Sequence, residues 1–217
     1  MSSQIACINM IKQQLRTGDV LNDRILDLFK TIPRENFVPK EFKHFAYSDM
    51  RIDLPHQQKM MAPLEEATLL QSLDLKGTET VLEVGTGTGF LTALLSRLAK
   101  HVLSIDYFSD FTAQARLKLA EHQCKNVELV TGDAARGWVD KAPYDVVVFT
   151  GAVPEITDTH RLQVLPGGKL FIIVGDKPIM PAVLLTLTQD NVWEEKLIFE
   201  TSIPPLINKL KPKEFVF

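Results

Sequence analysis

Residues 80–90 decide the fold, and they read Thr80-Val81-Leu82-Glu83-Val84-Gly85-Thr86-Gly87-Thr88-Gly89-Phe90. The run from Thr80 to Val84 is short, apolar and β-branched, which is typical of a strand covered on both faces. Gly85 ends that strand, and the glycines permit a tight turn that brings the backbone close to a ligand. A helix is expected directly afterwards, at Leu91–Leu98, so that its free N–H groups face the same pocket.

The same alternation of strand and helix continues along the chain. Further strands are predicted at His101–Ile105, Val127–Val130, Tyr144–Phe149 and Lys169–Val174, with a helix at Phe111–His122. Five strands in this order predict an α/β fold with a doubly wound, Rossmann-like parallel sheet. After Gly175, the runs Val183–Leu187 and Lys196–Ile203 flank a turn at residues 189–191, which indicates a hairpin. We therefore expect about seven strands, with an antiparallel strand near one edge.

Residues 1–73 have a different pattern. Apolar residues recur at helical spacing in residues 5–15, in residues 20–29 and again from Met60 to Leu73. Pro33 ends the second of these helices, and Pro63 lies in the first turn of the third. Glu65 and Glu66 follow near the positive end of that helix dipole. The expected organisation is one domain, with a helical cap at 1–73 and a Rossmann-like core at 74–217.

Composition excludes several classes of protein. Hydrophobic residues make up 45% of the 217 residues and charged residues 24%, which is ordinary for a folded globular chain. The net charge of −3 argues against binding nucleic acid through bulk electrostatics. Cys7 and Cys124 form no CxxC pair, and the histidines share no ligand spacing, so neither a disulfide framework nor a metal is expected. No signal peptide or membrane span is predicted, and we expect a cytoplasmic monomer. Residues 209–214 read as a solvated charge run.

The glycine-rich turn has two possible interpretations as a ligand-binding loop. A nicotinamide-binding loop has the spacing GxGxxG and places a pyrophosphate at the helix start. Here the spacing is GxGxG, and Glu83 stands two residues before the first glycine. A carboxylate is unfavourable beside a pyrophosphate, but it suits a ligand that carries an ammonium and a sulfonium group. The turn therefore predicts a site for S-adenosylmethionine, although a lone GxGxG can also be a turn without a ligand.

Acidic residues at the ends of the next two strands agree with this prediction. Asp106 follows the second strand, where a carboxylate can accept hydrogen bonds from both hydroxyls of a ribose. Asp133 follows the third strand and can accept from an adenine amino group. An Asp after a strand is more often a helix cap, but three such features in order on adjacent strands favour a ligand site. The predicted cofactor-binding residues are Glu83, Gly85, Thr86, Gly87, Gly89, Asp106, Tyr107, Asp133 and Ala134.

The chain resembles the protein-L-isoaspartate O-methyltransferases over nearly its whole length. The residues that carry the resemblance are Met10–Leu15, Ile32–Pro39, Val81–Phe90, Ser104–Asp106, Thr131–Asp133, Tyr144-Asp145 and Leu165–Leu170. The N-terminal stretches are similar to a signature that ordinary class I methyltransferases lack. Asp106 stands where the family usually has Glu, a tolerable exchange for a ribose ligand. The resemblance implies an enzyme that uses S-adenosylmethionine to methylate the carboxylate of isoaspartyl residues for protein repair.

The chain departs from this family in its substrate loop. The family has Gln-Thr-Ile-Ser, one further residue and Pro, whereas this chain has Gln58-Lys59-Met60-Met61-Ala62-Pro63. Met61 therefore occupies the position of the family's serine and Lys59 that of its threonine, and these two are the candidate catalytic residues. A second departure is Ser202–Leu206, where the family has an extended Arg-Phe-Val-Pro-Leu segment; here Pro204 removes a backbone donor.

These departures leave the acceptor open. A carboxylate acceptor is already ionised at pH 7 and needs no general base, so the family's serine is more plausibly an orienting hydrogen bond than a nucleophile. Lys59 could attract an anionic acceptor, or could hold its carboxylate too tightly. The leading interpretation has isoaspartyl peptides or proteins as partners. The alternatives are a methyltransferase of the same fold with another, anionic acceptor, and a cofactor-binding module without transfer activity.

Overall fold

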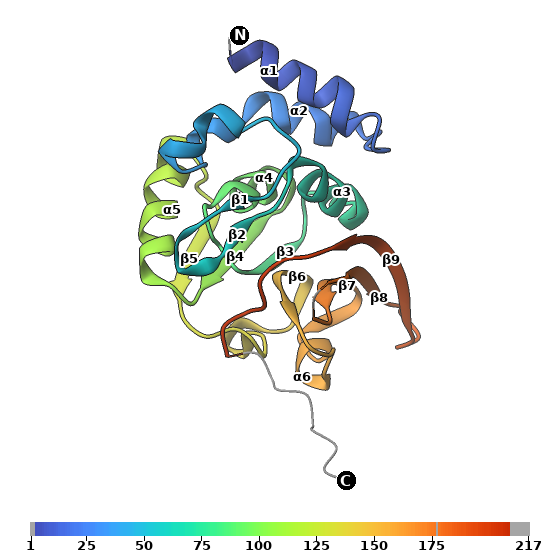
Figure 1. The fold of residues 1–217 in the computed structure, drawn as a ribbon. Helices are drawn as coiled ribbons and strands as arrows, with labels where there is room; N and C mark the ends of the chain where they lie inside the picture. Colours follow the sequence, from blue (N-terminus) through green and yellow to red (C-terminus); the bar gives the residue numbers. More distant parts are fainter. Residues whose placement is uncertain (1–2, 177, 209–217) are drawn as a thin grey trace.

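The seven-stranded sheet is the centre of the fold in the computed structural model, which describes residues 3–176 and 178–208 (Figure 1). The predicted charge run at 209–214 lies outside the described residues. The strand order is β5-β4-β3-β6-β7-β8-β9. The strands are β3 (Thr80–Val84), β4 (His101–Asp106), β5 (Val127–Thr131), β6 (Tyr144–Val153), β7 (Val164–Val174), β8 (Met180–Leu187) and β9 (Trp193–Thr201).

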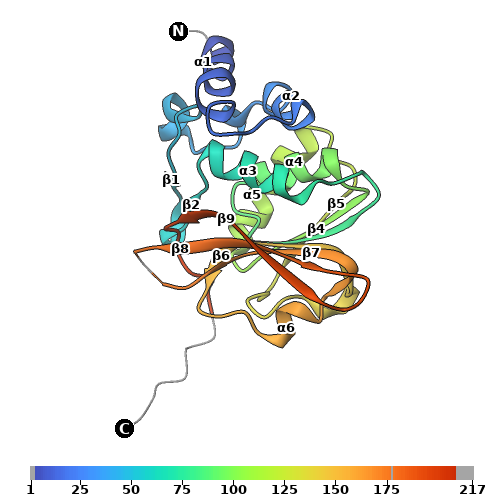
Figure 2. The same ribbon diagram turned by 90° about the vertical axis from the view of Figure 1, so that its right-hand side faces the viewer.

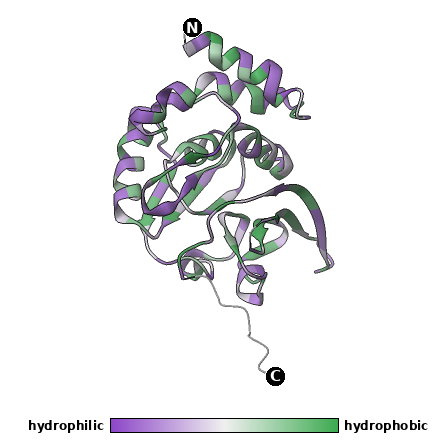
Figure 3. Ribbon diagram, in the orientation of Figure 1, coloured by the Kyte–Doolittle hydropathy of each residue, from purple (hydrophilic) through white to green (hydrophobic). Residues whose placement is uncertain are grey.

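Five of these strands are parallel, as predicted. β3 pairs in parallel with β4 on one side and with β6 on the other. Helices α4 (Phe90–Leu98) and α5 (Ser109–Glu121) make the two crossovers on the β4 and β5 side. Figure 2 shows α3, α4 and α5 above the sheet and the short helix α6 (Asp158–Arg161) below it. Apolar side chains from both faces of the strands fill the two layers of core, and Figure 3 colours most of the central strands as hydrophobic.

The predicted hairpin closes one end of the sheet. β8 is antiparallel to both β7 and β9, so it is the antiparallel strand expected near this edge. The turn between β8 and β9 holds Asn191 at a φ of 59°, and the Asn191 N–H donates to the Thr188 carbonyl at 3.1 Å. Asn tolerates this left-handed conformation better than most residues, which explains its place in the turn. The fold class is confirmed.

The N-terminal elements form a cap on one side of the sheet. Its helices are α1 (Ser3–Met10), α2 (Asp23–Thr31) and α3 (Pro63–Leu73), with a π-helical turn at Ile11–Leu15 and 3₁₀ turns at Arg34–Asn36, Lys40–Phe45 and Pro55–Gln57. Strands β1 (Ile52–Asp53) and β2 (Lys59–Met60) form a separate two-stranded antiparallel sheet. Side chains of the cap and of the main sheet share one apolar core, and the single-domain organisation divided at residues 73 and 74 stays a prediction.

The predicted start of the third helix is wrong by three residues. Met60 belongs to β2, where it pairs with Ile52, and α3 begins only at Pro63. Proline disfavours helical geometry in the residue before it, and Ala62 is accordingly extended. The Glu65 carboxylate accepts a hydrogen bond from the Ala62 N–H at 2.9 Å and so caps the new start. Hydrophobic periodicity does not reveal this boundary, because apolar residues such as Met60 and Met61 fit a helix and a strand equally well.

Within the cap, a buried ion pair joins the 3₁₀ turn after α2 to α3. Arg34 and Glu66 are 1% and 2% exposed, and the Arg34 guanidinium binds the Glu66 carboxylate. A second guanidinium nitrogen of Arg34 donates to the Met61 carbonyl at 2.5 Å. The guanidinium also lies 5.0 Å from the centre of the Phe90 ring at the start of α4, where it makes a cation–π contact. One side chain thus connects three elements.

No helix within the residues that the structure describes is long and apolar enough to cross a membrane.

Replacing Arg34 by Met should destabilise the protein strongly, because it leaves the Glu66 carboxylate buried without its partner. Loss of one member of a buried pair costs about 3–5 kcal/mol. Urea titration of the free energy of unfolding measures the effect. The matched control is Lys30→Met, which breaks the exposed Lys30–Asp27 pair and should change stability by less than about 1 kcal/mol. Equal, small effects of both variants would contradict this assignment.

Candidate functional site

One pocket lies at the carboxyl ends of the parallel strands, where open α/β sheets bind ligands. It brings together most of the predicted cofactor residues, which come from the turn after β3, the end of β4 and the loop after β5. Those that line it are Gly85, Thr86, Gly87, Asp106, Tyr107, Asp133 and Ala134. Glu83 and Gly89 do not line it. The two candidate catalytic residues, Lys59 and Met61, line the same pocket from the cap.

The glycine-rich turn is shaped by close contacts that admit no side chain. Gly85 has a φ of 102°, and a Cβ there would lie 2.1 Å from the Thr150 hydroxyl oxygen. That hydroxyl contacts the carbonyls of Val84 and Gly85 at 3.0 and 2.9 Å, so it joins the turn to β6. Gly89 has a φ of 82° and begins α4, and a Cβ there would approach Ala115 of α5 to 3.0 Å. Gly89 therefore lets α5 pack against the turn and does not face the pocket.

Asp106 lies opposite this turn with both carboxylate oxygens engaged. Its oxygens accept hydrogen bonds from the Gly87 N–H at 2.8 Å and the Phe108 N–H at 2.9 Å. Burial raises the pKa of the Asp106 carboxyl, and these two N–H groups oppose the shift. Each oxygen of a carboxylate can accept a second hydrogen bond, so two hydroxyl groups of a ligand can still be bound.

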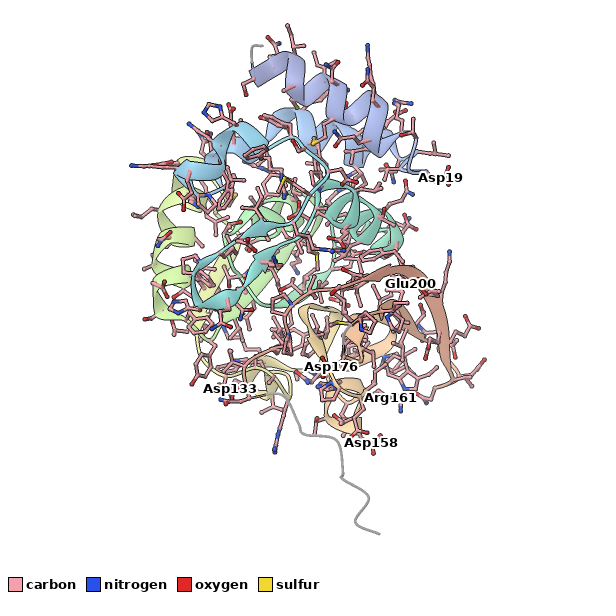
Figure 4. All side chains as sticks on the ribbon, in the orientation of Figure 1. Asp19, Asp133, Asp158, Arg161, Asp176 and Glu200 are labelled. Atoms are coloured by element: carbon pink, nitrogen blue, oxygen red, sulfur yellow. The ribbon has the colours of Figure 1, made fainter. Side chains whose placement is uncertain are left out.

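Asp133 lies on the loop after β5, beside the last described residues (Figure 4). One carboxylate oxygen accepts from the Ala135 N–H and the other from the Asn208 amide, both at 3.0 Å. The side chain is exposed, in contrast to Asp106. Asn208 thus reaches the predicted adenine position, a contact between residues 75 apart that spacing could not reveal.

Buried polar side chains from the far side of the sheet hold this loop in place. The Thr157 N–H lies 3.1 Å from Nδ1 of His160, so the proton of the neutral ring is on Nε2, which donates to the Ala135 carbonyl at 3.1 Å. Burial lowers the pKa of His160 and keeps the ring neutral. Gln163 donates to the Arg136 carbonyl at 3.2 Å. Both residues hold the loop from the side away from the pocket, and hydrophobic periodicity does not identify either of them.

Glu83 lies beneath the glycine-rich turn and has no contact with solvent. Its carboxylate accepts from the hydroxyls of Thr92 at 2.5 Å and Ser104 at 2.6 Å, and Ser104 lies 2.6 Å from the Thr86 hydroxyl at the pocket wall. The second carboxylate oxygen is buried without a partner among the described residues. Burial raises the pKa of Glu83 to about 7, although the two hydroxyls lower it. Glu83 is therefore connected to the pocket wall by hydrogen bonds through the hydroxyl groups of Ser104 and Thr86.

Met61 and Lys59 form part of the wall on the cap side. Met61 is 6% exposed, and its carbonyl is held by Arg34. The Lys59 ammonium binds the Asp53 carboxylate across the β1–β2 pair. The positive charge that could attract an anionic acceptor is therefore already paired with a carboxylate. Glu66 also lines this part of the pocket, a role that its position in a first helical turn did not predict.

The segment after β9 forms the adjoining wall. Ile203, Pro204 and Leu206 line the pocket, and Pro205 forms a parallel bridge with Ala152 at the end of β6. The Ala152 N–H donates to the Pro204 carbonyl at 3.3 Å, and the Leu206 N–H donates to the Ala152 carbonyl at 2.9 Å. This second departure from the family pattern thus extends the sheet by one short paired segment. Together with Met60 and Met61 it gives the acceptor end an apolar lining.

Several residues of the pocket were missed in the sequence. Thr150 and Gly151 lie in β6 directly after its predicted end at Phe149, and Phe108 and Phe111 follow Asp106. Position after a predicted strand end could have indicated all four. Among residues 3–176 and 178–208, no group of three or more His, Cys, Asp or Glu side chains is placed to hold a metal ion.

Comparison with known proteins shows which family this chain is similar to. The family model described as protein-L-isoaspartate(D-aspartate) O-methyltransferase matches residues 7–209. A protein-L-isoaspartate O-methyltransferase of Syntrophus aciditrophicus is 35% identical over 189 residues, which cover 87% of either chain. A solved protein-L-isoaspartate O-methyltransferase has a TM-score of 0.76 and 26% identity, over 94% of this chain and 65% of that one.

A further solved structure is similar in fold alone. It comes from Plasmodium falciparum, is described as a candidate protein-L-isoaspartate O-methyltransferase, and is in complex with S-adenosyl-L-homocysteine. Its TM-score is 0.75 at 15% identity, covering 95% of this chain and 98% of that chain.

Glu83 should make the protein less stable as the pH rises. The folded state holds the Glu83 proton up to about pH 7, whereas an unfolded Glu loses it near the ordinary value of 4.5. The folded state therefore binds more protons in this window, and its free energy of unfolding falls with rising pH. Relative to Glu83→Gln, the wild type should lose about 3 kcal/mol between pH 4.5 and 8.

Urea titrations of both proteins across that pH range measure the difference. Glu79→Gln is the control with the opposite sign: burial raises the pKa of Glu79, but the N–H groups of residues 76–78 outweigh this and lower it. The wild type should lose stability relative to that variant as the pH falls. A difference between wild type and Glu83→Gln that stays constant with pH would refute the assignment for Glu83.

Proposed function

This chain belongs to the protein-L-isoaspartate(D-aspartate) O-methyltransferase family, and we propose that it methylates isoaspartyl residues of damaged proteins. It is a methyltransferase, and the cofactor of the family is S-adenosylmethionine. One observation carries the proposal: the strand-end carboxylates and the substrate loop of the cap line a single pocket. A cofactor bound along the strand ends would therefore present its reactive end to residues 59–61.

The donors and acceptors of the pocket fit this cofactor. Asp106 supplies acceptors for the ribose hydroxyls, and Asp133 supplies one for the adenine amino group. Glu83 does not line the pocket, and it would act on the sulfonium and ammonium end of the cofactor only indirectly, through the hydroxyls of Ser104 and Thr86. The glycine-rich turn allows close approach of the backbone, since it carries no side chain at Gly85 and Gly87.

When bound, S-adenosylmethionine supplies an electrophilic methyl group. The chain itself has to orient the acceptor and exclude water. Met60, Met61, Ile203 and Pro204 line the acceptor end with apolar surface, which strengthens electrostatic interactions inside the pocket. An isoaspartyl carboxylate is ionised at pH 7, so no group has to remove a proton from it. Collapse of the methyl ester to a succinimide would then give the normal linkage a second chance to form.

A second candidate function is methyl transfer to a different acceptor. Three features favour it: Met61 stands in place of the family's serine, the Lys59 charge is paired with Asp53, and residues 204–206 are paired with β6. All three lie on the acceptor side and leave the cofactor side unchanged. A cofactor-binding module without transfer activity is the third possibility that the experiments below distinguish.

We also propose that the protein acts as a monomer in the cytoplasm. Cys7 and Cys124 are both free thiols, as expected in a reducing compartment.

Cofactor binding should depend on Asp106. Titration calorimetry with S-adenosylhomocysteine should give micromolar binding or better, and Asp106→Ala should weaken it at least about tenfold, because it removes the hydroxyl acceptor and the partner of the Gly87 N–H. Asp27→Ala, an exposed Asp on α2, is the control and should leave affinity unchanged. No heat with the wild type, or tight binding of a nicotinamide nucleotide, would refute the site.

Isoaspartyl methylation should be present but slow. The measurement is transfer of a labelled methyl group to an isoaspartyl peptide, compared with its normal-aspartyl twin and a panel of small molecules. Restoring the family residues with Met61→Ser and Lys59→Thr should raise the rate roughly tenfold to a hundredfold, the value of one or two orienting hydrogen bonds. Met50→Ser, an exposed Met outside the pocket, is the control.

The outcomes separate the candidates. An unchanged or lower rate in the double variant with intact cofactor binding favours a different acceptor. Intact cofactor binding with no transfer to any acceptor favours the module without transfer activity.

A further inference from the structure

The loop between β1 and β2 has a strained tip. His56 and Gln57 both have a φ of 58°, a left-handed conformation that non-glycine residues adopt only when surrounding contacts stabilise it. The two flanking strands have two residues each, and an isolated two-stranded pair of this kind is marginal in water. Contacts outside the pair must therefore hold the loop Leu54–Gln58 in place.

His56 supplies these contacts. Its ring stacks on the Phe108 ring with centroids 3.9 Å apart and planes 5° from parallel, and it meets Phe111 edge-on at 5.5 Å. Nε2 of His56 lies 3.0 and 3.1 Å from the two carboxylate oxygens of Asp110, so this nitrogen donates to the carboxylate. All three partners belong to the start of α5 or the residue before it, 52 or more positions away along the chain.

These contacts close the loop over the cofactor pocket. Leu54 and Gln58 line the pocket from the loop side, while Phe108 and Phe111 line it from the α5 side. A Leu54 methyl group lies 3.8 Å from the Cβ position of Gly87, directly against the glycine-rich turn. The Phe108 N–H donates to Asp106, so the ring under His56 and the carboxylate expected at the ribose belong to one short segment.

We propose that His56 is a positioning residue of the cofactor site: through Phe108 and Asp110 it holds the loop 54–58 closed over the glycine-rich turn and so retains bound cofactor. This inference rests on the proposed function only in taking the ligand of the pocket to be S-adenosylmethionine or its product. Residues that close a site after binding affect dissociation more than association. Loss of His56 should therefore raise the dissociation rate of the cofactor and leave its association rate nearly unchanged. A residue that only stabilises the fold would not produce this difference.

The test measures association and dissociation rates of S-adenosylhomocysteine by surface plasmon resonance on the immobilised full chain. His56→Ala should raise the dissociation rate about tenfold, as expected for loss of a stacked and hydrogen-bonded ring, with little change in the association rate. His56→Phe keeps the stacking without the Asp110 contact and should lie between wild type and His56→Ala.

His101 offers a matched control. Its side chain is 38% exposed and pairs with Glu128 at 3.9 Å, much as His56 is 39% exposed and pairs with Asp110, but it lies at the amino end of β4. His101→Ala should leave both rates unchanged.

An unchanged dissociation rate in folded His56→Ala would overturn the proposal, as would a loss of affinity that arises only in the association rate. If His56→Ala does not fold, Asp110→Ala on the half-exposed first turn of α5, which removes the acceptor of the His56 Nε2–H, decides in its place and should also speed dissociation. Failure of the wild type to bind S-adenosylhomocysteine would instead refute the cofactor assignment, so the two failures are distinguishable.

Discussion

The buried pair of Arg34 and Glu66 fixes the relation between the cap and the pocket. Removing both charges from water is costly: burial raises the pKa of the Glu66 carboxyl, and the Arg34 charge opposes this rise and favours the ionised form. The pair favours one particular arrangement of the cap, because the same guanidinium also binds the Met61 carbonyl and lies over the Phe90 ring. The backbone at the acceptor end is therefore set by a residue of the N-terminal connector, and the cap is a structural part of the site.

Two carboxylates near the glycine-rich turn are given different tasks by their surroundings. Asp106 borders the pocket, where burial raises the pKa of its carboxyl and two N–H groups oppose this rise. Glu83 receives two hydroxyl donors but is wholly buried, so burial dominates and its proton is held more tightly. Asp106 thus faces the pocket, whereas Glu83 is an enclosed group whose charge changes near pH 7.

The sheet and the glycine-rich turn were predictable because their signals are local. Short β-branched runs and glycines identify strands and turns without knowledge of distant partners. Strand alternation could also have shown that Glu83 shares a face with Val81 and points toward α4, away from a ligand above the strand ends. The Arg34–Glu66 pair and the His56–Phe108 stack could not be predicted, since each joins residues more than 30 positions apart. Met60 was assigned to a helix because an apolar residue before Pro63 fits either structure.

The paired segment after β9 limits how this pocket can recognise an acceptor. Among residues 204–206, which the structure describes, Leu206 alone has an N–H, and it is donated to Ala152. Residues 204–206 therefore have no free N–H group with which to pair an incoming peptide as an added strand. They can contact it only through their side chains. Such a preorganised wall loses little conformational entropy on binding, and it selects acceptor molecules by their size and shape. A change of acceptor during evolution would then require new side chains at 203–206 and would leave the sheet that carries them intact.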